Sequence, residues 1–353
     1  MTRFHPPDSP VTFRRKWSLT NWLRLATWAL LVAVLLGQLG HRFFLFELAS
    51  HFAVQYVAVA ALLLVYWLFR RRWPALPAAV VLLWQGAVVC PWLMARPDVA
   101  RPDVARPDVA RPDVRFPAGT RLNVRFPAGT RPGRVDLRVL HANVLYTNTN
   151  TERILTLVRQ TNPDVFVLQE MTSESIDALK ALCATYPYQL ETWSKGPCHI
   201  LVGSRTPFRI NDRAVRTQQV IHLTTRARGR DWSLVTVHPR TPLLPSWFAE
   251  RNAQLTFVSN AARRENRPTL LIGDFNVSVF SPVYTQLFGQ PAGLSACRKG
   301  FGLGVTWNRY LPPLMLPIDH AFVNDGFRTV RFQTLDQPGS DHNALLVELA
   351  FSD

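Results

Sequence analysis

The chain has 353 residues and a formal net charge of +16, from 40 Lys and Arg against 24 Asp and Glu. Residues 1–133 hold 17 basic and 6 acidic residues, whereas residues 134–353 hold 23 and 18. A strongly basic balance often indicates a nucleic acid or an anionic surface as partner. Here most of the excess lies in the first 133 residues, so charge alone is weak evidence for DNA binding.

Three apolar stretches predict transmembrane helices within the first 95 residues, at about residues 22–40, 48–69 and 74–95. Each is close to the roughly 20 apolar residues that a spanning helix needs. Basic clusters at residues 14–16 and 70–72 precede the first stretch and follow the second. Because cytoplasmic flanks carry excess Lys and Arg, we expect both clusters in the cytoplasm. Three spans then place everything after residue 95 on the outer side, with the lipid bilayer as a partner.

Residues 96–133 consist mostly of short repeats, and we predict that they form a linker. ARPDV occurs four times between residues 95 and 114, and VRFPAGTR then occurs twice. Proline at every fifth residue of the first array denies a helix its hydrogen bonds and favours extended geometry. We expect a polyproline-II-like or disordered spacer.

The four cysteines show no metal-binding spacing such as C-x-x-C. Cys90 lies in an apolar stretch. Cys183, Cys198 and Cys297 could supply one disulfide and a free thiol in an oxidising compartment. The sequence is equally compatible with three unpaired thiols.

Residues 134–353 predict a mixed α/β domain with more strands than helices. Apolar runs predict strands at residues 135–144, 164–169, 198–204, 218–224, 231–238, 267–273, 317–323, 327–334 and 343–350. Helices are predicted at 151–161, 173–185 and 245–264. Several strands follow one another directly, which favours mixed sheets over one parallel layer. About 220 residues can bury one substantial core.

Polar side chains occur where these predicted strands begin or end. They are Asn143, Glu170, His238, Asp274 with Asn276, Asp319, and Asp341 with His342. A single strand-ending Asn or Asp is usually a turn residue. Several such ends together carry the residue types of metal-assisted hydrolysis: oxygen ligands suit Mg²⁺, and acid–base and charge-stabilising steps at phosphate use His, Asp and Asn.

Four motifs in this order, HANV, DVFVLQE, LLIGDFN and GSDHNALLVEL, with IDHAFVN between the last two, resemble the endonuclease/exonuclease/phosphatase superfamily. Arg251, Gln254 and Trp307 further resemble a bacterial subgroup in which the domain follows N-terminal transmembrane helices. The resemblance implies a DNase I-like fold for residues 134–353: a four-layer α/β sandwich of two packed mixed sheets flanked by helices. It also implies a bacterial cytoplasmic-membrane protein with its catalytic domain on the periplasmic or extracellular side.

The resemblance implies roles for the polar side chains. Glu170 corresponds to a ligand of a divalent metal, Mg²⁺ or also Mn²⁺, with Asn143 beside it on metal or phosphate. Asp341 corresponds to a neighbouring acid that is a second-metal ligand in some members. Asp274 and Asn276 correspond to the pair that orients the attacking water and steadies the pentavalent phosphorus.

His342 corresponds to a histidine that acts on phosphate or water and pairs with an acid, here Asp319. His238 corresponds to a group that contacts phosphate or protonates the leaving oxygen. The phosphate contacts implied are therefore Asn143, His238, Asn276 and His342. Which group is the general base and which the acid stays open.

The expected function is a membrane-tethered, divalent-metal-dependent phosphoesterase that attacks phosphorus with an activated water. Its substrate is a phosphoester of nucleic acid, phospholipid or inositol phosphate, and the superfamily does not decide among them. The alternative is a catalytically silent membrane-anchored module that binds a phosphate ligand or a partner. No obligate protein partner is evident from the sequence.

Overall fold

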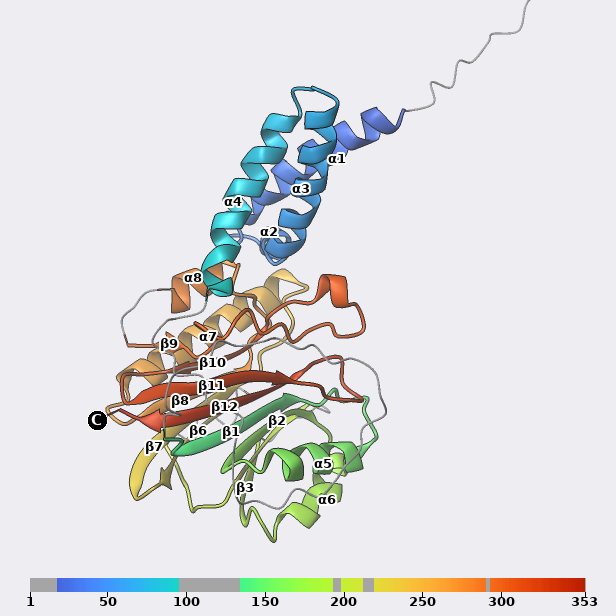
Figure 1. Ribbon diagram of the computed structural model, residues 1–353. Coiled ribbons are helices and arrows are strands. Elements are labelled where there is room, and N and C mark those ends of the chain that lie inside the picture. The colour runs from blue at the N-terminus through green and yellow to red at the C-terminus, as the bar shows by residue number, and fades with distance from the viewer. Residues whose placement is uncertain (1–17, 95–133, 193–197, 212–218, 290–292, 353) are drawn as a thin grey trace, which may run out of the picture.

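A computed structural model describes residues 18–94, 134–192, 198–211, 219–289 and 293–352. The predicted linker, residues 96–133, therefore lies outside the described residues. The described chain forms an N-terminal group of helices and an α/β domain next to it (Figure 1).

Two mixed six-stranded sheets form the centre of the α/β domain. The first has the order β11-β12-β1-β2-β4-β3 and the second the order β5-β6-β7-β8-β10-β9. In the first sheet the strands are β1 (Leu137–Asn143), β2 (Val165–Met171), β3 (Tyr188–Glu191), β4 (His199–Ser204), β11 (Phe327–Leu335) and β12 (Ala344–Phe351). In the second they are β5 (Arg209–Ile210), β6 (Val220–Ala227), β7 (Arg230–Val237), β8 (Thr269–Asp274), β9 (Ser295–Ala296) and β10 (Asp319–Val323).

Parallel pairing joins β1 to β2 and β7 to β8, and the remaining neighbours are antiparallel. Each parallel pair is linked by a stretch that contains a helix, α5 (Thr151–Thr161) in the first sheet and α7 (Pro245–Arg264) in the second. Parallel strands require such a crossover connection.

Successive side chains along each strand point alternately into the core between the two sheets and toward the outer helices. On β1, Val139 points into the core between the two sheets, whereas Leu140 packs with α5 on the outer face. On β8, Ile272 points into the same inter-sheet core, and Leu271 packs with α7. Side chains of successive strand residues point to opposite faces, so each sheet is covered by the other sheet on one face and by helices on the other. The predicted four-layer α/β sandwich is confirmed.

Further helices complete the outer layers. They are α6 (Ser173–Ala178) and η1 (Leu179–Leu182) beside the first sheet, and α8 (Pro282–Phe288) beside the second, with η3 (Pro312–Leu314) in the loop before β10. The sequence did not predict α8, β3, β5 or β9. The three strands have two to four residues, too few to produce a clear alternation of apolar side chains. The predicted helix 173–185 is instead α6 followed by the 3₁₀ turn η1.

The N-terminal helices are α1 (Leu19–Gly37), α2 (Phe44–Ser50), α3 (Ala53–Phe69) and α4 (Ala75–Leu93). Two of them, α1 and α4, are long and apolar enough to cross a membrane, and the bent pair α2–α3 could provide a third span. The predicted second span, 48–69, begins inside α2, and the chain bends by 62° between α2 and α3. Close to this bend, Glu47 and His51 are buried against the α/β domain.

The four cysteines are free thiols in the structure. The sequence left open whether two of Cys183, Cys198 and Cys297 form a disulfide. In the structure these three cysteines are unpaired.

Candidate active site

The polar residues predicted from the strand ends gather at one edge of the two sheets. Asn143 ends β1 and pairs in register with Gln169 of the parallel strand β2, so Glu170 follows immediately beside it. From the second sheet, Asp274 at the end of β8 lies directly opposite Asp319 at the start of antiparallel β10. The packing of the two sheets brings these ends together, because both parallel pairs finish at the same edge.

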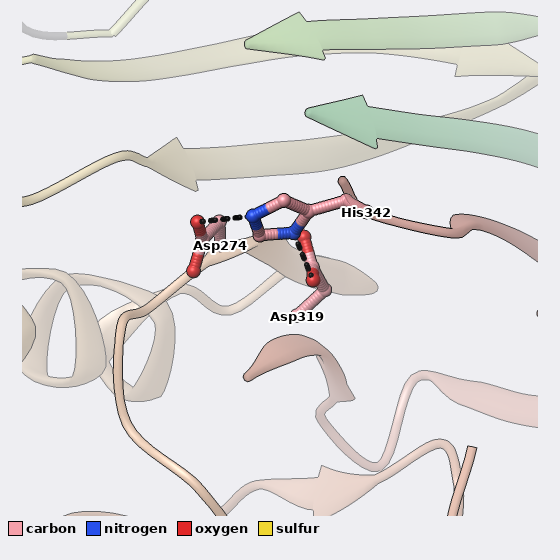
Figure 2. A group of neighbouring side chains, drawn as sticks. All are labelled: Asp274, Asp319 and His342. Atoms are coloured by element: carbon pink, nitrogen blue, oxygen red, sulfur yellow. Dashed lines mark hydrogen bonds and ion pairs between the residues drawn. The ribbon is translucent and has the colours of Figure 1, made fainter. Parts of the chain in front are cut away.

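His342 lies between two buried carboxylates (Figure 2). Its Nδ1 is 2.8 Å from Oδ2 of Asp319, and its Nε2 is 3.7 Å from Oδ2 of Asp274. Burial lowers the pKa of His342, but the charge of Asp319 and its hydrogen bond outweigh this and raise the pKa to about 10. At neutral pH the ring is therefore an imidazolium that carries a hydrogen on Nε2.

Asp319 is fully buried and both of its oxygens have histidine partners. Oδ2 faces His342, and Oδ1 lies 2.9 Å from Nε2 of His141. Burial raises the pKa of this carboxyl, but the charge of His342 and the two hydrogen bonds outweigh burial and hold the pKa below its usual range. Asp319 is thus a permanent anion that fixes the orientation of both imidazoles.

Asp274 has the opposite electrostatic environment. Burial and the neighbouring charge of Asp319 raise the pKa of Asp274 to about 8, although His342 opposes the shift. Its Oδ1 accepts a hydrogen bond of 2.8 Å from the backbone N–H of Asn276, and its Oδ2 accepts one of 3.2 Å from Nδ2 of Asn143. A carboxyl that titrates near neutral pH is a suitable acceptor for a proton from water.

Glu170 enters the site through an irregularity in β2. The register between β2 and β4 shifts between Leu168 and Met171, and Glu170 has a positive φ of 58°. Such bulges redirect a side chain. Its Oε1 accepts from Nδ2 of Asn143 at 2.8 Å, and its Oε2 accepts from the backbone N–H of Tyr146 at 3.1 Å.

His238, directly after β7, lies between the two acids. Its Nε2 is 3.6 Å from Oε1 of Glu170 and 3.7 Å from Oδ2 of Asp274. Burial lowers the pKa of His238, and the charge of Glu170 only partly offsets this. The neutral form of this imidazole is therefore favoured in the unliganded site.

The stretch Gly273 to Asn276 is a turn that carries side chains in two directions. Phe275 is fully buried and stacks on Phe322, whereas Asn276 has a φ of 49° and is half-buried. Nδ2 of Asn276 donates to the carbonyl of Pro239 at 3.0 Å. A Cβ on Gly273 would lie 2.3 Å from the carbonyl oxygen of Val237, so glycine here permits the close approach of β7 and β8.

Asp341 lies beside the cluster, with a different set of partners. Its Oδ2 accepts from the indole N–H of Trp307 at 2.7 Å, and its Oδ1 is buried without a partner among the described residues. Asp341 therefore keeps one oxygen free for a ligand.

Sequence reasoning did not assign a role to several residues that build the site. His141 is the second partner of Asp319, and Gln169 joins the two sheets by donating to Val237 and accepting from the N–H of Asp274 at 3.0 Å. Arg251 donates to the carbonyl of Asn276 at 2.9 Å. Each lies in or near a motif quoted from the sequence, but its partner is far away in the chain.

The donor set fits a divalent cation. Glu170 and Asp274 both accept from the same amide nitrogen of Asn143, so their carboxylates lie side by side. Asp274, Asp319 and His342 also form a group whose possible ligand atoms lie within 4.8 Å of one another. In that group, however, both oxygens of Asp319 already face histidines. Oxygen donors suit Mg²⁺, which makes Glu170 the better candidate to hold it and leaves Asp274 beside the cation.

Comparison with known proteins identifies a family that matches most of the α/β domain. Residues 140–342 match the profile described as the Endonuclease/Exonuclease/phosphatase family. No curated protein sequence matches significantly.

Several solved structures share the fold. TDP2 of D. rerio in complex with a single-strand DNA product is 18% identical and has a TM-score of 0.51, covering 61% of this chain and 99% of that one. A humanized D. rerio TDP2 has the same identity and coverage and a TM-score of 0.52. An endonuclease/exonuclease/phosphatase family protein of Bacteroides thetaiotaomicron is 19% identical with a TM-score of 0.51, covering 62% of this chain and 98% of that one. At such identities the likeness shows the fold.

The profile spans more than half of the chain, and its two ends fall within β1 and at His342 of the buried cluster. The chain therefore belongs to the endonuclease/exonuclease/phosphatase family.

Proposed function

We propose that the protein is a membrane-tethered, divalent-metal-dependent phosphoesterase that attacks phosphorus with an activated water. The observation that carries this proposal is the geometry of the buried Asp319–His342 pair, which places Nε2 of His342 3.7 Å from the carboxyl of Asp274. His342 is held as a cation by Asp319, while the adjacent carboxyl of Asp274 has a pKa of about 8. A fixed cationic donor next to a carboxyl that titrates near neutrality is an acid–base pair with separated roles.

In this proposal Asp274 accepts the proton of the attacking water, together with Asn276, which shares its turn. The imidazolium of His342 donates to the phosphate oxygens, where negative charge grows in the transition state. Asn143 and Asn276 add neutral contacts to phosphate. His238, whose neutral imidazole is favoured, contacts a phosphate oxygen, since it lies in the same cluster.

Mg²⁺, or Mn²⁺, would be held by Glu170, with Asn143 beside it, and Asp341 offers a further oxygen. When bound, the cation would neutralise charge on phosphate. Asp274 is then left to act on the attacking water.

The domain organisation belongs to the same proposal. Residues 1–95 are the anchor, residues 96–133 the linker and residues 134–353 the catalytic domain, on the outer face of a bacterial cytoplasmic membrane. Two to three apolar helices support the anchor.

The test uses the full chain in detergent micelles with bis(p-nitrophenyl) phosphate as a soluble phosphodiester. EDTA should abolish turnover, and Mg²⁺ or Mn²⁺ should restore it. Glu170→Gln and His342→Ala should each lower kcat by about 10²-fold or more, because each removes a charge aimed at the reacting phosphate. Glu152→Gln, an exposed acid on α5, is the matched control and should keep full activity.

The alternative, a silent phosphate-binding module, makes a different prediction. In that case the wild type shows no metal-dependent turnover on any phosphodiester, while phosphate ligands still raise its Tm by mass action. Turnover that persists unchanged in Glu170→Gln would also contradict the proposed site.

A further inference from the structure

Exposed apolar side chains of the catalytic domain are concentrated around the mouth of the site. Among the described residues from 134 onward, eight large hydrophobic side chains are exposed, and six of them lie in three loops. The six are Tyr146, Leu243, Leu244, Tyr310, Leu311 and Leu314. We call these six residues the apolar rim. Exposed apolar side chains that gather beside a site, rather than occurring singly over the surface, indicate an interaction site.

Each of the three loops is tied to a site residue by a hydrogen bond. The backbone N–H of Tyr146 donates to Glu170 at 3.1 Å. Thr241, in the loop with Leu243, donates to Oδ1 of Asn276 at 3.3 Å. The N–H of Arg309, next to Tyr310, donates to the carbonyl of Asp341 at 2.9 Å. The apolar rim therefore borders the polar cluster.

One of these loops, and the helix that follows another, contact the N-terminal helices. Nε2 of Gln55, near the start of α3, donates to the carbonyl of Pro313 at 3.0 Å. Glu47 of α2 forms a buried ion pair with Arg251 of α7, the helix that follows the loop of Leu243 and Leu244. In Figure 1 these N-terminal helices extend away from the domain on the side of α7 and α8. Part of the apolar rim therefore lies close to the end of the N-terminal helices that contacts the domain.

The basic side chains of these loops give little support to a nucleic-acid groove. Arg240 lies over the ring of Trp247, 5.5 Å from its centroid, and Arg309 pairs with Asp336. Both guanidinium groups thus already have partners, and Arg and Trp are amphipathic side chains that are favoured at membrane interfaces. Nucleic-acid sites instead present rows of Lys and Arg to phosphates.

We propose that the apolar rim docks on the lipid leaflet next to the domain, and that the site takes phosphoesters of lipid headgroups in that leaflet. This inference rests on the phosphoesterase function proposed above. In the reaction the water oxygen bonds to phosphorus and one phosphorus–oxygen ester bond breaks. The water loses one proton and the leaving oxygen gains one, so a phosphodiester yields an alcohol and a phosphate monoester.

Docking is tested without reference to activity. Benzoylphenylalanine replaces Leu311 in the rim or Tyr188 on β3, an exposed aromatic at the end of the domain away from the anchor (Figure 1). After illumination of proteoliposomes made from phosphatidylethanolamine and phosphatidylglycerol, mass spectrometry should find lipid adducts at position 311 and none at position 188. Absence of adducts at position 311 overturns the docking surface.

Substrate class is tested with the full chain in the same proteoliposomes and in others that contain phosphatidylcholine or sphingomyelin. Release of headgroup products is compared with turnover of bis(p-nitrophenyl) phosphate and of single-stranded DNA. In the double variant Leu243→Asp with Leu311→Asp, the ratio of lipid turnover to soluble turnover should fall by about tenfold or more, because a charged side chain replaces an apolar one at two points of the docking surface. Tyr188→Asp should leave that ratio unchanged.

The outcomes separate the two proposals. Hydrolysis of DNA but of none of the lipids would overturn the lipid assignment and leave the phosphoesterase proposal intact. An unchanged ratio in the double variant would overturn the role of the apolar rim. If no probe is hydrolysed, including the soluble phosphodiester, the proposed function itself fails, while the adducts at position 311 still decide the docking surface.

Discussion

Asp274 shows how one buried carboxyl can serve activity at the expense of stability. Its pKa is raised to about 8 by burial and by Asp319, in a site without a cation. A carboxyl whose folded pKa is above its unfolded value contributes stability that is fully present below the unfolded pKa and lost as the pH rises through the folded pKa. The stability that Asp274 contributes is therefore lost as the pH rises from about 4, the usual pKa of a carboxyl, to about 8.

Asp274→Asn should therefore have opposite effects on activity and on metal-free stability. We expect kcat to fall by about 10²-fold or more, because the proton acceptor is lost. In EDTA, the Tm of the wild type relative to Asp274→Asn should decrease as the pH rises from 4 to about 8 and then level off. Thermal unfolding of both proteins across this range, with product release measured in Mg²⁺, checks both effects. A pH-independent difference in Tm would show that the carboxyl does not titrate as described.

At this scale the sequence predicted which polar residues meet, but not all of their partners. Asn143, Asp274 and Asp319 could be recognised because each stands where an apolar run begins or ends. The contribution of His141 could not, since a histidine inside a strand is usually a structural residue. Its partner Asp319 is 178 positions away in the chain, and only the packing of the two sheets brings them together.

At the scale of elements, α2 is linked to the catalytic turn through α7. Glu47 of α2 pairs with Arg251, and both side chains are fully buried. Oε1 of Glu47 also accepts from Ser281 at 2.7 Å, at the start of α8. Nη1 of Arg251 donates to the carbonyl of Asn276. The anchor therefore supplies the counter-charge for a residue that holds the turn of the site.

Glu47→Gln should destabilise the full chain and weaken catalysis. Removing one partner of a buried ion pair leaves an uncompensated charge and costs about 3–5 kcal/mol. We expect a lower Tm in micelles, followed by near-UV circular dichroism, and a lower kcat with little change in KM for the soluble phosphodiester.

The double variant Glu47→Met with Arg251→Met is the control for this link. A buried ion pair can often be replaced by apolar residues of similar volume without loss of stability. The double variant should therefore regain much of the Tm, but not the kcat, because the hydrogen bond to Asn276 stays absent. Equal Tm values for the wild type and Glu47→Gln would contradict the link.

The sequence predicted the long elements of the sandwich and missed the contact between the anchor and the domain. Strands such as β1 and β12 have seven and eight residues, and their apolar side chains outnumber the polar ones, so composition predicts them. Glu47, by contrast, lies in a short segment that contains polar residues, and the sequence predicted a loop there between two spans. Its burial depends on Arg251, so neither residue alone predicts the docking.

At the scale of the whole molecule, α3 and α4 contact the α/β domain at one end and are joined by a turn at the other. The N-terminus of α3 contacts the domain through Gln55, and Trp92 near the end of α4 lies 6.0 Å from the ring of Tyr284. The turn between α3 and α4, with the basic cluster at residues 70–72, lies at the far end of the helices (Figure 1). The α/β domain and this basic cluster are thus at opposite ends of the N-terminal helices.

Alkaline phosphatase fusions in a bacterial host test the resulting topology. The enzyme folds only outside the cytoplasm, where its disulfides form. A fusion after Asp353 should be active and a truncated fusion after Arg72 inactive, because the positive-inside rule holds the 70–72 cluster in the cytoplasm. Replacing the three arginines at 70–72 by Ala should lower the activity of the Asp353 fusion by weakening that bias. An active fusion at Arg72 with an inactive one at Asp353 would reverse the orientation and place the catalytic domain in the cytoplasm.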